Sequence, residues 1–135
     1  MYTIALGYVK VPTPGTPVSL STVITTYNAA LAAAGKTFQL DANEKVHKIE
    51  AWPLLSNTGV VYLGLDTSAS CSTGAVMNKS TGVGVIKAVQ VPGASGHQDC
   101  AFVEGEGNEN TVRIADYAID AANANEGFMI YGFKS

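Results

Sequence analysis

The chain has 135 residues, a length that fits one domain able to bury a core without staples. Hydrophobic residues make up 47% of it and charged residues only 14%, against about 25% charged residues in an average soluble domain. The net charge is −3 and the eight basic residues form no patch, which argues against nucleic-acid binding. No stretch approaches the roughly 18 apolar residues of a membrane span, so we expect neither nucleic acid nor membrane as partner.

The first seventeen residues predict a strand followed by a proline-rich arm. Apolar residues alternate through Ile4, Leu6 and Tyr8, the period of a strand with one buried face. Prolines then follow at positions 12, 14 and 17, and proline removes donors from a ladder. We therefore expect an edge strand and an arm over residues 1–17, and a single domain over residues 18–135.

The segment from Ser21 to Ala34 predicts the one helix. Ser21 or Thr22 can be its N-cap, alanines fill its body, and Gly35 can end it at C′, the position after the C-cap. One apolar face at helical spacing carries Ile24, Tyr27 and Leu31. We expect a short helical insertion at about 21–35, laid over the sheet or at one end of it.

Two turns have similar sequences, each with asparagine first and glycine third. Asn57-Thr58-Gly59 precedes a strand over Val60–Leu65, and Asn125-Glu126-Gly127 precedes another over Phe128–Phe133. Glycine tolerates the positive φ that hairpin turns need. We therefore predict that the first turn joins a strand over Val46–Leu55 to Val60–Leu65 as a hairpin.

The fold class follows from the number and spacing of strands. Further strands are predicted over Val85–Val91, Ala101–Val103 and Val112–Ala115. About eight short strands separated by turn residues are typical of a sandwich or jelly roll. We expect a mainly all-β protein, an antiparallel, jelly-roll-like β-sandwich with one short helical insertion.

Candidate ligands for a metal are few. His97-Gln98-Asp99-Cys100 supplies one group of candidate zinc ligands, to which His47 or Cys71 could be added, but zinc sites usually show paired ligands on both sides of the site. The loop from Glu104 to Asn110 could, if extended, aim four oxygen ligands to one side, although its spacing differs from a calcium loop. We expect no metal, no cofactor and solvated loops at both places.

The sequence also lacks catalytic signatures. It has no nucleophile elbow and no phosphate-binding loop, so we expect a binding or structural module without catalytic residues. Cys71 and Cys100 are expected to be reduced thiols. Trp52 and the tyrosines could alternatively form a sugar-binding platform, although aromatic residues on strands are more often core.

Several motifs in chain order resemble small structural proteins of tailed bacteriophage virions, of the head decoration or cement kind. They are Gly7-Tyr8-Val9-Lys10-Val11, Gly15-Thr16-Pro17-Val18-Ser19-Leu20, the strand from Val46, Asn57-Thr58-Gly59 with its strand to Gly64, and the closing Asn125-Glu126-Gly127 strand. The resemblance covers most of the chain and no single motif is diagnostic. The helical insertion and the Ser/Gly segment 66–84 depart from the shortest members.

The resemblance implies a non-enzymatic capsid decoration protein on the capsid exterior of a virion, made in the host cytoplasm. Its implied partners are the major capsid protein and itself, as a homotrimer. Strand addition by the N-terminal segment gives the expected contact residues Tyr2, Ile4, Val9, Val11, Pro12, Pro14 and Pro17. A tail, baseplate or head-tail connector component, or a carbohydrate-binding module, stays open as an alternative.

Overall fold

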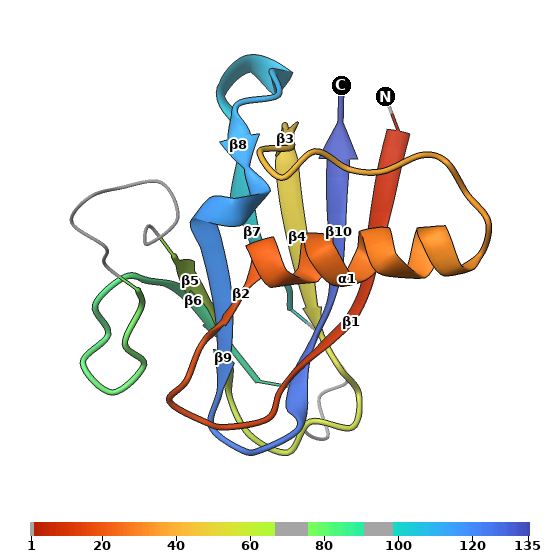
Figure 1. Ribbon diagram of the computed structural model, residues 1–135. Helices are drawn as coiled ribbons and strands as arrows, with labels where there is room; N and C mark the ends of the chain where they lie inside the picture. Colours follow the sequence, from red (N-terminus) through yellow and green to blue (C-terminus); the bar gives the residue numbers. More distant parts are fainter. Residues whose placement is uncertain (1, 67–75, 91–98) are drawn as a thin grey trace.

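The computed structural model describes residues 2–66, 76–90 and 99–135, and in this part of the chain the fold is mainly β (Figure 1). Two four-stranded sheets, all antiparallel, pack around one core. Sheet A has the order β1 (Tyr2–Val11), β10 (Glu126–Lys134), β4 (Lys48–Pro53) and β7 (Ala101–Glu104). Sheet B has the order β2 (Val18–Ser19), β9 (Tyr117–Ala121), β5 (Val61–Leu65) and β6 (Val85–Val89). The predicted antiparallel β-sandwich with one helix is confirmed.

Smaller elements lie beside the two sheets. The short strands β3 (Lys45–Val46) and β8 (Val112–Arg113) pair with each other. Two single turns of 3-10 helix, η1 (Glu106–Asn108) and η2 (Ile114–Asp116), flank β8. These pieces close the end of the sandwich where the chain termini lie (Figure 1).

The alternation of side chains along the strands builds the core. In β4, Ile49 and Ala51 are buried while Lys48, Glu50 and Trp52 are only partly covered, as the period-two alternation of a strand requires. Residues that are almost inaccessible to solvent come from both sheets and from the helix, among them Phe128, Ile130, Ile49, Leu63, Ile119 and Leu20. Each such side chain contributes about 1.5–3 kcal/mol when moved out of water.

Strand β1 contains a bulge that decides which of its residues face the core. Its register against β10 shifts between Ala5 and Gly7, and Gly7 has φ +97°. Because of the inserted residue, Leu6 and Val9 both point inward although they are three positions apart. The predicted alternation is therefore wrong at Tyr8, which points outward and is 72% exposed.

The helix α1 spans Leu20–Ala33 and begins one residue earlier than predicted. Its N-cap is Ser19 and not the predicted Ser21 or Thr22, and the Ser19 Oγ accepts a hydrogen bond from the Ser21 N–H at 3.2 Å. At the other end Gly35, at φ +76°, donates to the carbonyl of Ala32, and Lys36 donates to that of Leu31. These two bonds are a Schellman motif, so the predicted role of Gly35 is confirmed.

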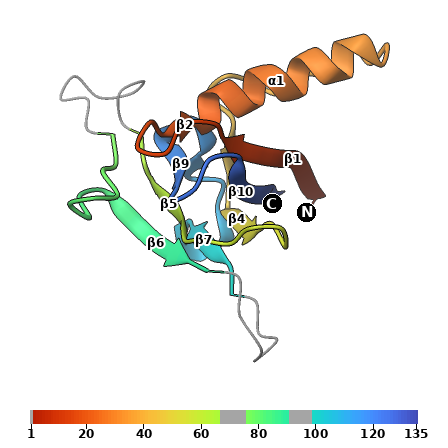
Figure 2. The ribbon, with the colours of Figure 1, turned by 90° about the horizontal axis from the view of Figure 1, so that it is seen from below.

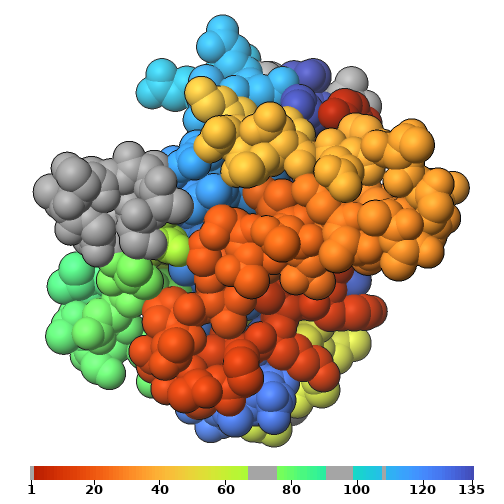
Figure 3. Space-filling model, viewed as in Figure 1, coloured from red at the N-terminus to blue at the C-terminus, as the bar shows by residue number. Residues whose placement is uncertain are grey.

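The fully buried side chains of α1 all come from its first half, and Tyr27 packs against the edge of the core. Leu20, Val23 and Ile24 are buried, whereas Tyr27 and Leu31 of the predicted apolar face are partly exposed. The later turns project past β1 (Figures 1 and 2). The segment after the helix folds back along it, and in the space-filling view the two form one continuous surface (Figure 3).

The predicted hairpin through Asn57-Thr58-Gly59 is wrong, because β4 lies in sheet A and β5 in sheet B. The Asn125-Glu126-Gly127 turn likewise joins β9 of sheet B to β10 of sheet A. Both turns therefore cross between the sheets. Local turn chemistry specifies a reversal of the chain, whereas the sheet that the next strand enters is decided by packing of its apolar face.

The role predicted for the glycines in these turns is also wrong. The positive φ belongs to Asn125, at +63°, and neither Gly59 nor Gly127 has one. A Cβ added to Gly127 would lie 1.9 Å from the carbonyl oxygen of Val9. Close approach of two backbones, and not a left-handed conformation, requires glycine at this position.

Candidate functional site

The predicted N-terminal contact residues do not form one exposed surface. The side chains of Ile4, Val9 and Val11 are buried in the core, and β1 pairs with β10 from Tyr2 to Val11. This differs from the expected arm, because the apolar alternation of β1 is satisfied inside its own domain. The expectation of an edge strand is confirmed among the described strands, where β1 is the outer strand of sheet A.

The remaining predicted contacts lie at the two ends of β1. Tyr2 is about half exposed, Pro12 and Pro14 are exposed, and Pro17 is partly exposed. The prolines belong to a short turn between β1 and β2 and not to an extended arm. This turn, residues 12–17, is here called the proline turn.

A buried carboxylate holds the proline turn in place. The Gly15 N–H donates to Asp120 Oδ1 at 3.1 Å, and the Thr16 N–H donates to the Thr13 carbonyl at 3.0 Å. Asp120 is 1% exposed and also accepts from the Ala121 N–H at 2.8 Å. The exposed prolines are therefore presented on a fixed loop.

The two crossing turns interlock beside the proline turn. Glu126 Oε2 accepts from the Thr58 N–H at 2.7 Å and from its hydroxyl at 2.9 Å, and Oε1 accepts from the Gly59 N–H at 2.9 Å. Asn57 makes a reciprocal pair with the backbone of Gly127, donating at 2.8 Å and accepting at 3.1 Å. The similar sequences of the two turns reflect this joint structure.

The environment of Glu126 favours its charged form. Burial raises the pKa of this carboxyl, but hydrogen bonds from the backbone of Thr58 and Gly59, from the Thr58 hydroxyl and from Asn123 outweigh burial and lower it. The carboxylate thus stabilises the fold, and its donors leave no position for a reacting group. We assign it a structural role.

A groove on the outer face of sheet A is the clearest candidate binding site. Tyr8 on β1 lies opposite Met129 on β10, and Met129 lies opposite Trp52 on β4. Tyr131, two residues after Met129, continues this surface, and Leu55 forms its rim with 79% exposure. The cavity between these residues, here called the sheet A groove, has a volume of about 340 Å³.

Charged side chains border the sheet A groove. Glu50 lies opposite Tyr131 and accepts from the indole N–H of Trp52 at 3.1 Å. Lys48 Nζ lies 3.0 Å from Glu50 Oε2 and 3.5 Å from Glu104 Oε1. Burial raises the pKa of Glu50, but hydrogen bonds from Lys48 and Trp52 outweigh it and lower the pKa, so Glu50 is an anionic acceptor at neutral pH.

The sequence indicates Trp52 as a possible binding residue but does not reveal the groove around it. The alternation of β4 places Trp52 on the outer face, and the same rule applied to β10 would have placed Met129 and Tyr131 outward. The pairing of β1 with β10 and of β10 with β4 joins segments from both ends and the middle of the chain. A single sequence carries no signal for that register.

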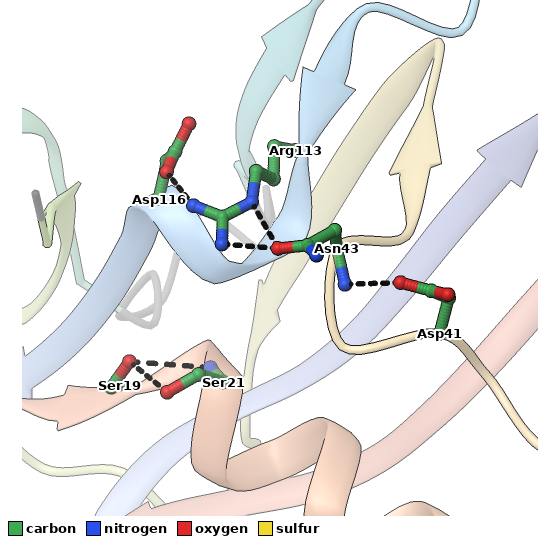
Figure 4. A network of polar contacts seen from close by, with 6 residues as sticks. All are labelled: Ser19, Ser21, Asp41, Asn43, Arg113 and Asp116. Atoms are coloured by element: carbon green, nitrogen blue, oxygen red, sulfur yellow. Dashed lines mark hydrogen bonds and ion pairs between the residues drawn. The ribbon is translucent and has the colours of Figure 1, made fainter. Parts of the chain in front are cut away.

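The single arginine has a structural role at the opposite end of the molecule. Arg113 Nη1 donates to Asp116 Oδ1 at 2.8 Å, and its Nε and Nη2 donate to Asn43 Oδ1 at 3.1 and 2.5 Å (Figure 4). The Asn43 N–H in turn donates to Asp41 at 2.7 Å. The network connects the loop after α1 to η2. The Arg113 guanidinium donates three of its hydrogen bonds.

The described residues do not assemble either of the metal sites weighed from the sequence. The 104–110 loop is not extended, because Gly107 has φ +62° and η1 interrupts the alternation, while Glu104 pairs with Lys48. Within the described ranges no three His, Cys, Asp or Glu side chains group as a metal site would need. His97 and Cys71 lie outside the described residues.

The thiol of Cys100 is half-buried. Burial raises its pKa, and the nearby carboxylates of Glu50 and Asp99 raise it further, so the reactive thiolate is disfavoured. The pairing of Cys100 with Cys71 lies outside the described residues. The prediction of reduced thiols stays a prediction.

Comparison of the chain with protein-family models, with curated proteins and with solved structures found no match. In the described part of the chain, no helix has the length and apolar character needed to cross a bilayer.

Proposed function

We propose that this protein is a capsid decoration protein of a tailed bacteriophage, a non-enzymatic structural subunit that binds the major capsid protein on the capsid exterior. The motif order described above supports this proposal. The strand arrangement supports it too. Sheet A takes β1, β10, β4 and β7 while sheet B takes β2, β9, β5 and β6, an order compatible with the two Greek keys of a jelly roll, a fold that viral capsid domains use.

The observation that carries the proposed contact is the free edge of β1. This strand is ten residues long and pairs on one side with β10, and it is the terminal strand of sheet A as described. Such an edge presents unpaired backbone N–H and C=O groups that a neighbouring chain can extend. We propose that the capsid protein contacts this edge and the adjoining proline turn.

Assembly as a homotrimer would strengthen a small contact of this kind. Each copy would contribute one β1 edge and one proline turn, and simultaneous binding raises the effective concentration of the second and third contacts. The fixed proline turn supports this mechanism, because a rigid loop loses little conformational entropy when it binds.

Hydrogen–deuterium exchange with and without capsids tests the contact. We expect slower exchange in the peptide covering Tyr2–Val11 when the protein is bound to capsids, because amides at the free edge would gain partners. The peptide covering α1 serves as an internal control and should not change. Unchanged exchange in β1 on saturated capsids would contradict the edge mechanism.

Substitutions in the proline turn provide a second test. Pro12→Glu with Pro14→Glu places two charges on exposed positions that do not pack in the core, and we expect weaker co-sedimentation with capsids. Thr25→Glu, on the exposed face of α1, is the matched control. Deleting residues 1–17 is unsuitable, because it would remove the buried side chains of β1 and unfold the domain.

A further inference from the structure

The sheet A groove combines aromatic surface with polar groups in a way that points to a ligand. Its apolar floor is formed by Trp52, Met129 and Tyr131, and Tyr8 stands beside it with most of its ring exposed. Aromatic rings present flat apolar faces and, in tyrosine, a hydroxyl at the rim. A volume of about 340 Å³ lies at the lower end of small-molecule sites, roughly 300–1,000 Å³.

The position of Trp52 is fixed by its polar neighbour. Its indole N–H donates to Glu50 Oε1, and Glu50 Oε2 is held by Lys48. The ring is therefore oriented before a ligand arrives, which lowers the cost of binding. Lys48 also lies 5.0 Å from the centre of the Phe102 ring, so the ammonium group is directed toward β7.

Charge at the groove selects among ligands. Lys48 is shared by the two carboxylates Glu50 and Glu104, so these three side chains together carry one net negative charge beside Trp52. An anionic ligand would be repelled, whereas hydroxyl groups can donate to the Glu50 carboxylate. A ligand with an apolar C–H face and hydroxyl groups around its rim fits both features.

From this geometry we propose that the sheet A groove is a binding site for neutral glycans. One sugar ring stacks its C–H face on Trp52 and Tyr8, and its hydroxyl groups hydrogen-bond to Glu50 and to the tyrosine hydroxyls. The inference goes beyond capsid decoration and does not depend on it, because the proposed capsid contact uses the edge of β1 and the proline turn.

Intrinsic fluorescence gives a site-specific readout, since Trp52 is the only tryptophan of the chain. A glycan array with neutral and acidic glycans identifies the probe, and the strongest neutral glycan is then titrated into the full-length protein. We expect a saturable change in the emission of Trp52. Tyr8→Ala should weaken binding about tenfold, and Tyr8→Phe should weaken it less because the ring is kept.

Phe38→Ala is the matched control, because Phe38 is an exposed aromatic residue that does not line the groove. Its affinity should equal that of the wild type. The proposal would be overturned by absence of neutral-glycan binding, by binding of acidic glycans alone, or by unchanged affinity in Tyr8→Ala. Sedimentation showing that copies of the chain associate through this face and exclude the glycan would also overturn it.

Discussion

Replacing Glu126 by glutamine should destabilise the domain strongly, although the side chain keeps its size. The amide retains one oxygen, which can still accept from the Gly59 N–H. Its NH₂ group would then face the Thr58 N–H, which now lies 2.7 Å from Oε2, so one donor loses its acceptor. An unsatisfied donor costs about 1–3 kcal/mol and hydrogen bonds to a charged group are stronger than neutral ones, so we expect a loss of about 2–3 kcal/mol.

Urea and thermal unfolding at pH 7 measure this loss. For a domain of this length about 2–3 kcal/mol corresponds to a decrease in Tm of about 10 °C. Glu106→Gln is the control, because Glu106 is exposed in the 104–110 loop, and its effect should stay within about 0.5 kcal/mol. An equal, small effect of both substitutions would refute the assignment of Glu126 as the residue that joins the two turns.

The destabilisation caused by Glu126→Gln should depend on pH. The folded pKa of Glu126 is lowered, so its stabilising contribution is present above the unfolded pKa of about 4.3 and is lost as the pH falls through the folded value. The difference in unfolding free energy between wild type and Glu126→Gln should therefore shrink as the pH falls below about 4.3. A constant difference down to pH 2 would contradict the ionised carboxylate.

Two glycine substitutions test backbone geometry. Gly127→Ala should prevent the observed pairing of β10 with β1, because its Cβ would lie 1.9 Å from the Val9 carbonyl oxygen. We expect loss of soluble folded protein, measured by circular dichroism. Gly132→Ala is the milder comparison, because its Cβ would meet only side chains, at 3.3 Å or more. Gly35→Ala places an alanine at φ +76° with open space around it, so it should cost only about 1–2 kcal/mol in a urea titration. An unchanged free energy of unfolding in Gly35→Ala would contradict the left-handed conformation of residue 35 at the end of α1.

The sequence predicted the elements of this fold better than their connections. The two faces of β4, the edge position of β1 and the glycine that ends α1 follow from period-two alternation, proline content and cap chemistry, which are local properties. The crossing of both Asn-containing turns between sheets could not be predicted in the same way. A turn residue determines that the chain reverses, whereas the destination of the next strand depends on contacts with strands far away in sequence.

The candidate sites show the same division. Trp52 could be placed on an outer face from its own strand, but its neighbours in the groove are set by the register of three strands. Ile4, Val9 and Val11 are buried in the domain's own core, whereas the prolines that follow them suggested an arm that contacts a partner. The carboxylate of Asp120, which fixes the proline turn, has no local signature at all.

The copy number of this protein in purified virions tests the central proposal most directly. Quantitative mass spectrometry against the major capsid protein of the same particles should give a copy number that scales with the capsid lattice, as a decoration protein requires. A copy number matching a single ring of the tail, baseplate or head-tail connector would contradict capsid decoration, and absence from the virion would contradict a structural role altogether.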